Sequence, residues 1–189
     1  MSTLAFDPAA TALILIDLQN AIKARNPVPH SFDDVVARSV ALGDKLRAAG
    51  GTVVYVNVDV ADMQTHVADR SMRNPNDPPP PAIMSELVPE CGIQPGDLTI
   101  TKRSWGAFLK TTLDEQLRAK GVTTIILGGV ATNIGVESTA RSAYDLGYDI
   151  VFAEDAMATL SQEMHDFTIK VHFPMMGRVR STAEILEAL

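Results

Sequence analysis

The sequence predicts a three-layer α/β protein, with a doubly wound and mostly parallel six-stranded sheet and helices on both faces. Aliphatic runs alternate with helical patterns along the whole chain. The runs are continuous, as in Ala-Leu-Ile-Leu-Ile at 12–16, which is typical of strands buried on both faces. The chain has 189 residues, no internal repeat and no break in composition. We therefore predict a single domain over residues 1–189.

The predicted strands and helices follow one another in alternation. The strands cover 12–16, 52–58, 98–101, 123–127, 149–153 and 178–180. The first long helix begins after the N-cap Ser31, with Asp34 as its acidic partner, and ends at Gly50-Gly51. Two later helices cover 111–119 and 133–146. A further helix follows the cap Ser161, and the last one begins at Thr182. This order favours parallel strand pairs joined by helical crossovers.

Composition and charge exclude several classes of partner. The formal net charge is −7 and the sequence pI is near 5.0, which opposes binding to nucleic acid or to an anionic membrane surface. The apolar runs are too short to span a bilayer. The one cysteine, Cys91, cannot form an internal disulfide, and the first eight residues lack the pattern of a secretion signal. We therefore expect a cytoplasmic protein.

One long segment, residues 59–97, interrupts the alternation of strands and helices. It contains Pro75 and the proline run at 78–81, and it shows little periodicity. Loops of this length inside a compact domain are usually functional or disordered. Two interpretations remain open, namely a lid over a substrate and an extended surface strap or subunit contact.

Three strand ends carry residues that suggest a ligand site. Asp17 follows the first strand directly, Lys102 ends the third, and a glycine-rich turn at 128–135 follows the fourth. In open parallel sheets, ligands bind outside the carboxyl ends of the strands. A buried aspartate or lysine is costly unless it has a partner or a task. An acid, a base and a helix N-terminus at neighbouring strand ends therefore predict a small-molecule site.

Four motifs resemble those of the isochorismatase-like (cysteine hydrolase) superfamily, in the same order and spacing. They are ALILIDLQN, TKRSWGAF, GGVATNIGVESTARSAYDLGY and VFAEDA, and the similarity extends from about residue 10 to the C-terminus. The resemblance implies the doubly wound fold, a homo-oligomer, and catalytic roles for Asp17 and Lys102. It implies that Gly135 occupies the position where the superfamily usually has its nucleophilic cysteine. It also implies a non-proline cis peptide at Val130–Ala131.

Glycine at position 135 removes covalent catalysis by a thiolate. The isochorismatase branch of the superfamily also has glycine there and hydrolyses a vinyl ether, a reaction that needs a general acid rather than a nucleophile. The resemblance thus implies that Asp17 is the acid and that Lys102 orients it or binds a substrate carboxylate. The amides at the start of the following helix would offer an anion site. The candidate substrate-binding residues are Gln19, Trp105, Phe108, Ala131 and Asn133.

Two further functions remain open from the sequence. In one, Asp17 and Lys102 activate water against an amide or imide C–N bond; in the other, the protein binds a small molecule without chemistry. We interpret Cys91 as an ordinary free thiol, and Thr139 as a packing hydroxyl. No metal site is predicted, because the acidic residues after the second strand include only one nearby histidine, His66. No cofactor is predicted either.

Overall fold

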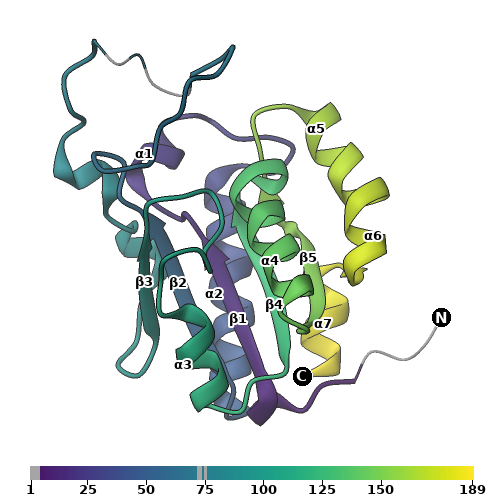
Figure 1. The fold of residues 1–189 in the computed structure, drawn as a ribbon. Coiled ribbons are helices and arrows are strands. Elements are labelled where there is room, and N and C mark those ends of the chain that lie inside the picture. The colour runs from purple at the N-terminus through teal and green to yellow at the C-terminus, as the bar shows by residue number, and fades with distance from the viewer. Residues whose placement is uncertain (1–4, 72–73, 75) are drawn as a thin grey trace.

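The computed structural model describes residues 5–71, 74 and 76–189, so Pro75 and the first four residues lie outside the described part of the chain. It contains a six-stranded sheet in the order β3-β2-β1-β4-β5-β6, and each neighbouring pair runs parallel (Figure 1). The strands are β1 (Thr11–Ile16), β2 (Thr52–Val58), β3 (Leu98–Lys102), β4 (Thr124–Val130), β5 (Asp149–Ala158) and β6 (Arg178–Arg180). The predicted fold class is confirmed.

Helices cover both faces of the sheet and bury alternate residues of each strand. Leu13 and Leu15 of β1 pack with α2 (Phe32–Ala48) and α7 (Thr182–Ala188) on one face. Ile14 and Ile16 point to the other face. That face is covered by α3 (Leu113–Ala119), α4 (Glu137–Asp145), α5 (Gln162–Phe167) and α6 (Phe173–Met176). Two apolar cores on opposite sides of one sheet explain why the strands read as continuous aliphatic runs.

The helix boundaries follow local capping chemistry. Ser31 caps α2, and its hydroxyl accepts a hydrogen bond from the Asp34 amide at 3.1 Å, as predicted. Ser181 caps α7 in a reciprocal capping box with Glu184. The predicted helix at 133–146 begins as a π-helical turn, Thr132–Val136, before it continues as α4.

Several short elements differ from the sequence prediction. α1 (Asn20–Lys23) and the 3₁₀ turns Pro8–Ala10, Ala82–Ser85 and Pro89–Cys91 were not predicted, because pieces this short show no periodicity. β5 continues to Ala158 rather than ending at Ala153, with an irregular register against β4. The pattern after Ser161 becomes α5, a π-helical turn (Thr168–His172) and α6.

The strand order reverses at β1, which lies between β2 and β4. The chain continues from β2 to β3 on one side of β1 and from β4 to β5 on the other side. A crevice opens at such a reversal, at the carboxyl ends of the strands. Asp17 directly follows β1, and Ala131 directly follows β4. Within the described residues, no helix is long and apolar enough to cross a membrane.

Candidate active site

Asp17 is held at the end of β1 by an unusual backbone conformation. Its φ angle is +53°, in the left-handed region that non-glycine residues adopt rarely. Its amide donates to the Val56 carbonyl at 2.7 Å, and its carbonyl accepts from the Gln19 amide at 2.8 Å. The chain thus turns sharply while its hydrogen bonds to β2 are kept. Backbone strain of this kind concentrates at functional sites.

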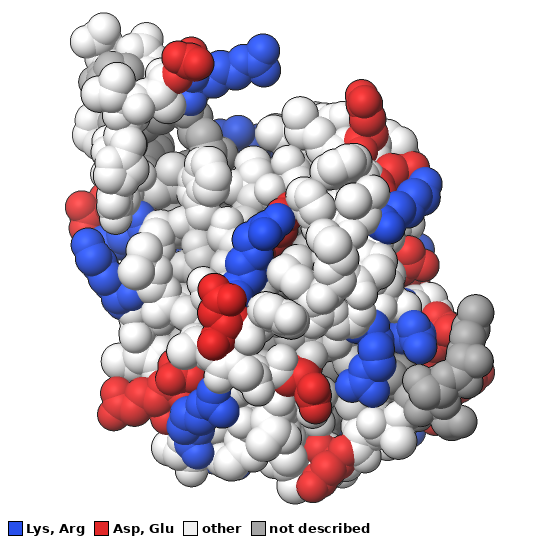
Figure 2. All heavy atoms as spheres, turned by 45° about the vertical axis from the view of Figure 1, so that its right-hand side comes forward, with Lys and Arg blue, Asp and Glu red and all other residues white. Residues whose placement is uncertain are grey.

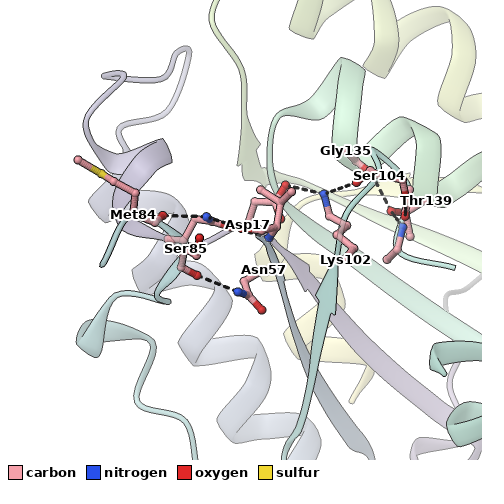
Figure 3. A network of polar contacts seen from close by, with 12 residues as sticks. Asp17, Asn57, Met84, Ser85, Lys102, Ser104, Gly135 and Thr139 are labelled. Carbon is pink, nitrogen blue, oxygen red and sulfur yellow. Dashed lines mark hydrogen bonds and ion pairs between the residues drawn. The ribbon is translucent and has the colours of Figure 1, made fainter. Parts of the chain in front are cut away.

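Lys102 and Asp17 form a buried ion pair. The Lys102 Nζ donates to Asp17 Oδ2 at 2.9 Å and to the Ser104 carbonyl at 3.3 Å (Figure 3). The two side chains are only 2% and 8% exposed. Within the described part of the chain, Asp17 Oδ1 is buried and has no hydrogen-bond partner. Burial raises the pKa of the Asp17 carboxyl above its ordinary value, and the Lys102 charge opposes this rise.

Gly135 lies directly against this carboxyl. A β-carbon at position 135 would lie 3.3 Å from Asp17 Oδ2 and 3.1 Å from the Ile16 side chain. The peptide bond at Val130–Ala131 is cis, as the resemblance implied. Thr139 fixes the turn, because its hydroxyl donates to the Gly135 carbonyl at 2.7 Å and accepts from the Ala107 amide at 3.1 Å. The buried Thr139 hydroxyl is thus occupied by structural hydrogen bonds.

A cavity of about 450 Å³ opens beside the turn. Ala131 and Ile134 form one wall, and Gly135, the next residue, contacts Asp17. Segment 59–97 contributes seven further lining residues, which are Val60, Met63, Thr65, Asp77, Pro78, Pro80 and Met84. This contribution supports the interpretation of the segment as a cover of the pocket. Asp17 and Lys102 themselves are not among the residues that line this cavity.

Two of the predicted substrate-binding residues use their side-chain amides within the protein. Gln19 is fully buried; its amide nitrogen donates to the Val58 and Met84 carbonyls at 3.1 and 2.9 Å. Its amide oxygen accepts from the Val58 amide at 2.8 Å. Asn133 accepts from the Thr159 hydroxyl at 2.5 Å. Gln19 therefore positions the pocket wall, and Asn133 ties the turn after β4 to the end of β5.

The two predicted aromatic walls occupy different places. The Trp105 side chain is 52% exposed, so it is not core filler, and its carbonyl lies 3.6 Å from the β-carbon position at Gly135. Trp105 thus borders the site through its main chain. Phe108 packs its ring against the apolar core, 5.8 Å from the Tyr148 ring, and is not among the residues that line the cavity. An aromatic near a strand end packs well in either place, and spacing alone does not separate the two.

The structure offers no alternative nucleophile at Cys91 and no cluster of metal ligands. Burial raises the pKa of the Cys91 thiol to about 12, and its sulfur lies 3.7 Å from the Leu18 carbonyl in the core. Over residues 5–71, 74 and 76–189, no group of three or more His, Cys, Asp or Glu side chains could hold a metal ion. His66 lies beside Gln64, and Asp62 pairs with Arg103.

Sequence reasoning missed most of the cavity. Arg25 and Ile22 line it from α1 and the turn that follows, and Val58 lines it from the end of β2. A lining position at the end of β2 could have been expected from the rule that ligands bind at strand ends. The α1 contribution carried no sequence signal, because a single helical turn has no apolar periodicity.

Comparison with known proteins gives a consistent result. The isochorismatase domain model matches residues 11–184. The uncharacterized isochorismatase family protein YwoC of Bacillus subtilis (strain 168) is 46% identical, over 99% of this chain and 98% of that protein. The ureidoacrylate amidohydrolase RutB of Pantoea ananatis is 31% identical, over 80% of this chain and 70% of that protein. The structure of an isochorismatase family protein from Burkholderia thailandensis superposes with a TM-score of 0.90 at 40% identity, covering 100% of this chain and 99% of that one. The chain belongs to the isochorismatase family of hydrolases.

Proposed function

We propose that this protein hydrolyses a small carboxylated metabolite by general acid–base catalysis at Asp17, without a protein nucleophile. One observation carries the proposal. The Asp17 carboxyl is buried, has one oxygen held by Lys102, and has the other oxygen without a partner among the described residues. The large majority of buried side-chain oxygens in proteins have a hydrogen-bond partner. The bare oxygen is therefore the atom that we assign to proton transfer.

Burial raises the pKa of Asp17, which favours the protonated form that a general acid needs. In vinyl-ether hydrolysis, Asp17 gives its proton to the terminal enol carbon, and an oxocarbenium ion forms. Water adds to this cation and returns a proton to Asp17. The hemiketal then breaks its C–O bond and yields a ketone and an alcohol. Lys102 holds Asp17 Oδ2 throughout, so Oδ1 is the oxygen that exchanges the proton.

Gly135 supports a nucleophile-free reaction, because it leaves space against Asp17 Oδ2 that a side chain would fill. The second candidate is hydrolysis of an amide or ureido C–N bond, with Asp17 as the base that activates water. The similarity to RutB, whose name describes an amidohydrolase, favours this alternative. Both candidates use the same carboxyl, and they differ in the bond that breaks.

The test offers the protein isochorismate and monitors hydrolysis through the release of pyruvate. In parallel it offers ureidoacrylate and monitors the release of ammonia. We expect turnover of isochorismate by the wild type and a loss of at least about 100-fold in Asp17→Asn, the usual scale of general acid–base catalysis. Asp97→Asn is the matched control, since Asp97 is an aspartate of another ion pair and its side chain is also buried, at 3% exposed. Turnover of ureidoacrylate alone would favour the second candidate. No turnover of either substrate, or full activity of Asp17→Asn, would contradict the proposal.

We also propose that the protein is a homo-oligomer. Exposed apolar side chains follow one another at helical spacing from Leu160 through α5 and the π-helical turn to α6, on the side that Figure 2 turns forward. They are Leu160, Met164, Phe167, Val171 and Met175, each at least 45% exposed. Such a stripe is typical of a subunit interface. Light scattering should show an oligomer for the wild type and a smaller species for Phe167→Glu; a monomeric wild type would contradict this.

The cytoplasmic location stays a prediction from the sequence. Its support is the single cysteine, which is buried and free. Fractionation of cells that express the tagged protein would test it, and recovery in an exported fraction would contradict it.

A further inference from the structure

The cavity beside the site has an apolar surface with few charged groups. Its apolar wall comes from five separate stretches of the chain, represented by Ile22, Met63, Pro80, Ile134 and Leu160. A volume of about 450 Å³ lies in the range of cavities that bind small metabolites. Apolar walls favour an apolar ligand body, and a few charged groups then fix its orientation.

Among the described residues that line the cavity, Arg25 is the one basic residue. Within the described ranges, its guanidinium has no ion pair and no hydrogen bond. Lys23, two residues earlier, pairs with Glu90 at 2.9 Å and with Asp33 at 3.4 Å. An unpaired arginine at the rim of an apolar cavity is a ready partner for an anion, because its planar fork matches a carboxylate.

The backbone around Arg25 fixes its position relative to Asp17. The Arg25 amide donates to the Ile22 carbonyl at 3.0 Å, and the following residue, Asn26, turns the chain with φ +47°. α1 itself begins three residues after Asp17. The acid and the arginine therefore belong to one short, hydrogen-bonded segment, with the cavity beside it.

Lys102 does not serve as this anion partner. Its side chain is 2% exposed and already bonds Asp17 and the Ser104 carbonyl. Among the described lining residues, Arg25 is therefore the cation left to bind an anionic end of the ligand.

We propose that Arg25 binds the carboxylate of the substrate and sets its specificity, while the apolar body lies along the proline and methionine wall. This inference rests on the proposed function and extends it to the class of substrate, a carboxylate with an apolar body and its reacting bond toward Asp17. Arg25 acts in binding and orientation, whereas Asp17 performs the chemistry. Recognition by Arg25 is therefore measurable without turnover.

The test compares benzoate with benzamide, two probes of nearly equal size that differ in charge. Affinities are measured at pH 7 by ligand-observed NMR titration for the wild type, Arg25→Gln, Arg25→Lys and Lys120→Gln. Lys120 is an exposed cation at the end of α3 and does not line the cavity, so its variant controls for the general loss of one positive charge. Asp17→Asn is included to separate binding from chemistry.

We expect benzoate to bind the wild type about tenfold more tightly than benzamide, the scale of one charge-assisted hydrogen-bonded pair. Arg25→Gln should remove this preference, Arg25→Lys should keep part of it, and Lys120→Gln should keep all of it. Equal affinities in the wild type, no binding of benzoate, or an unchanged preference in Arg25→Gln would overturn the inference. A preference that persists in Asp17→Asn, in a protein that turns over neither substrate, would refute the proposed function and leave Arg25 recognition standing.

Discussion

Two buried carboxylates in this molecule form ion pairs of similar length and differ in every other respect. Asp97 accepts from Arg47 Nε at 2.7 Å, from a second Arg47 nitrogen at 2.8 Å, and from the Gln94 amide at 2.8 Å. Both of its oxygens are thus bonded. Asp17 has its 2.9 Å bond to Lys102 on one oxygen and no partner on the other among the described residues.

The backbone shows the same contrast. Next to Asp97, the positive φ angle of +102° falls on Gly96, where it costs little. At the first strand end, the positive φ angle falls on Asp17 itself. Asp97 holds the pKa of Arg47 above its usual value, which is the behaviour of a pair that stabilises the fold. A buried ion pair therefore indicates function when one of its atoms is left unsatisfied and its backbone is strained.

The largest expected difference between the two pairs is in folding stability. Asp97→Asn leaves Arg47 without its bidentate partner, and we expect the free energy of unfolding to fall by about 2 kcal/mol. This figure is below that for a fully buried pair, because the Arg47 side chain is 20% exposed. Urea unfolding at pH 7 measures the change. A stability equal to that of the wild type would show that the Asp97 pair has no structural role.

A smaller effect is expected where the site is tightly packed. Gly135→Cys brings a β-carbon within 3.1 Å of Ile16, and we expect a stability loss of about 1 kcal/mol from overpacking. In a Cys91→Ala background, the new thiol should react with iodoacetamide faster than Cys91 does in the wild type, since burial raises the pKa of Cys91 to about 12. Equal alkylation rates for the two thiols would mean that position 135 does not face an open site.

The subtlest comparison concerns pH. Because burial raises the folded-state pKa of Asp17 above its ordinary value of 3.8, the native state binds more protons than the unfolded state between these two pKa values. The Asp17 contribution to stability therefore falls as pH rises through this window. Asp17→Asn should gain stability relative to the wild type over the same range, whereas Asp97→Asn loses stability at pH 7.

His165 provides an internal reference for this pH measurement. Burial lowers the pKa of His165 to about 4, so its contribution to stability is lost as pH falls from about 6.5 to about 4. This loss is common to the wild type and to Asp17→Asn, and it cancels in their difference. A difference curve that is flat with pH would contradict the raised pKa of Asp17.

The strands and the chemical groups at their ends could be predicted from the sequence, because burial on both faces leaves a plain aliphatic pattern. Asp17, Lys102 and Gly135 were placed at neighbouring strand ends, and the structure brings these three together. The contacts that each side chain makes at these strand ends could not be predicted from the sequence. Gln19 and Phe108 lie at the expected level of the sheet, but local hydrogen bonds and core packing direct them away from a ligand.

The hydrogen bonds of Gln19 have a consequence for how this protein can diverge. Gln19, which lies two residues after Asp17, holds Met84 by a hydrogen bond. Arg103 pairs with Asp62 near the start of segment 59–97. Between these anchors in the sequence lie Thr65, Pro78 and Pro80, which line the cavity and do not support the ion pair. Under the proposed function, changes in this stretch can alter which molecule fits while the reaction is preserved, so relatives that share Asp17 and Lys102 can act on different substrates.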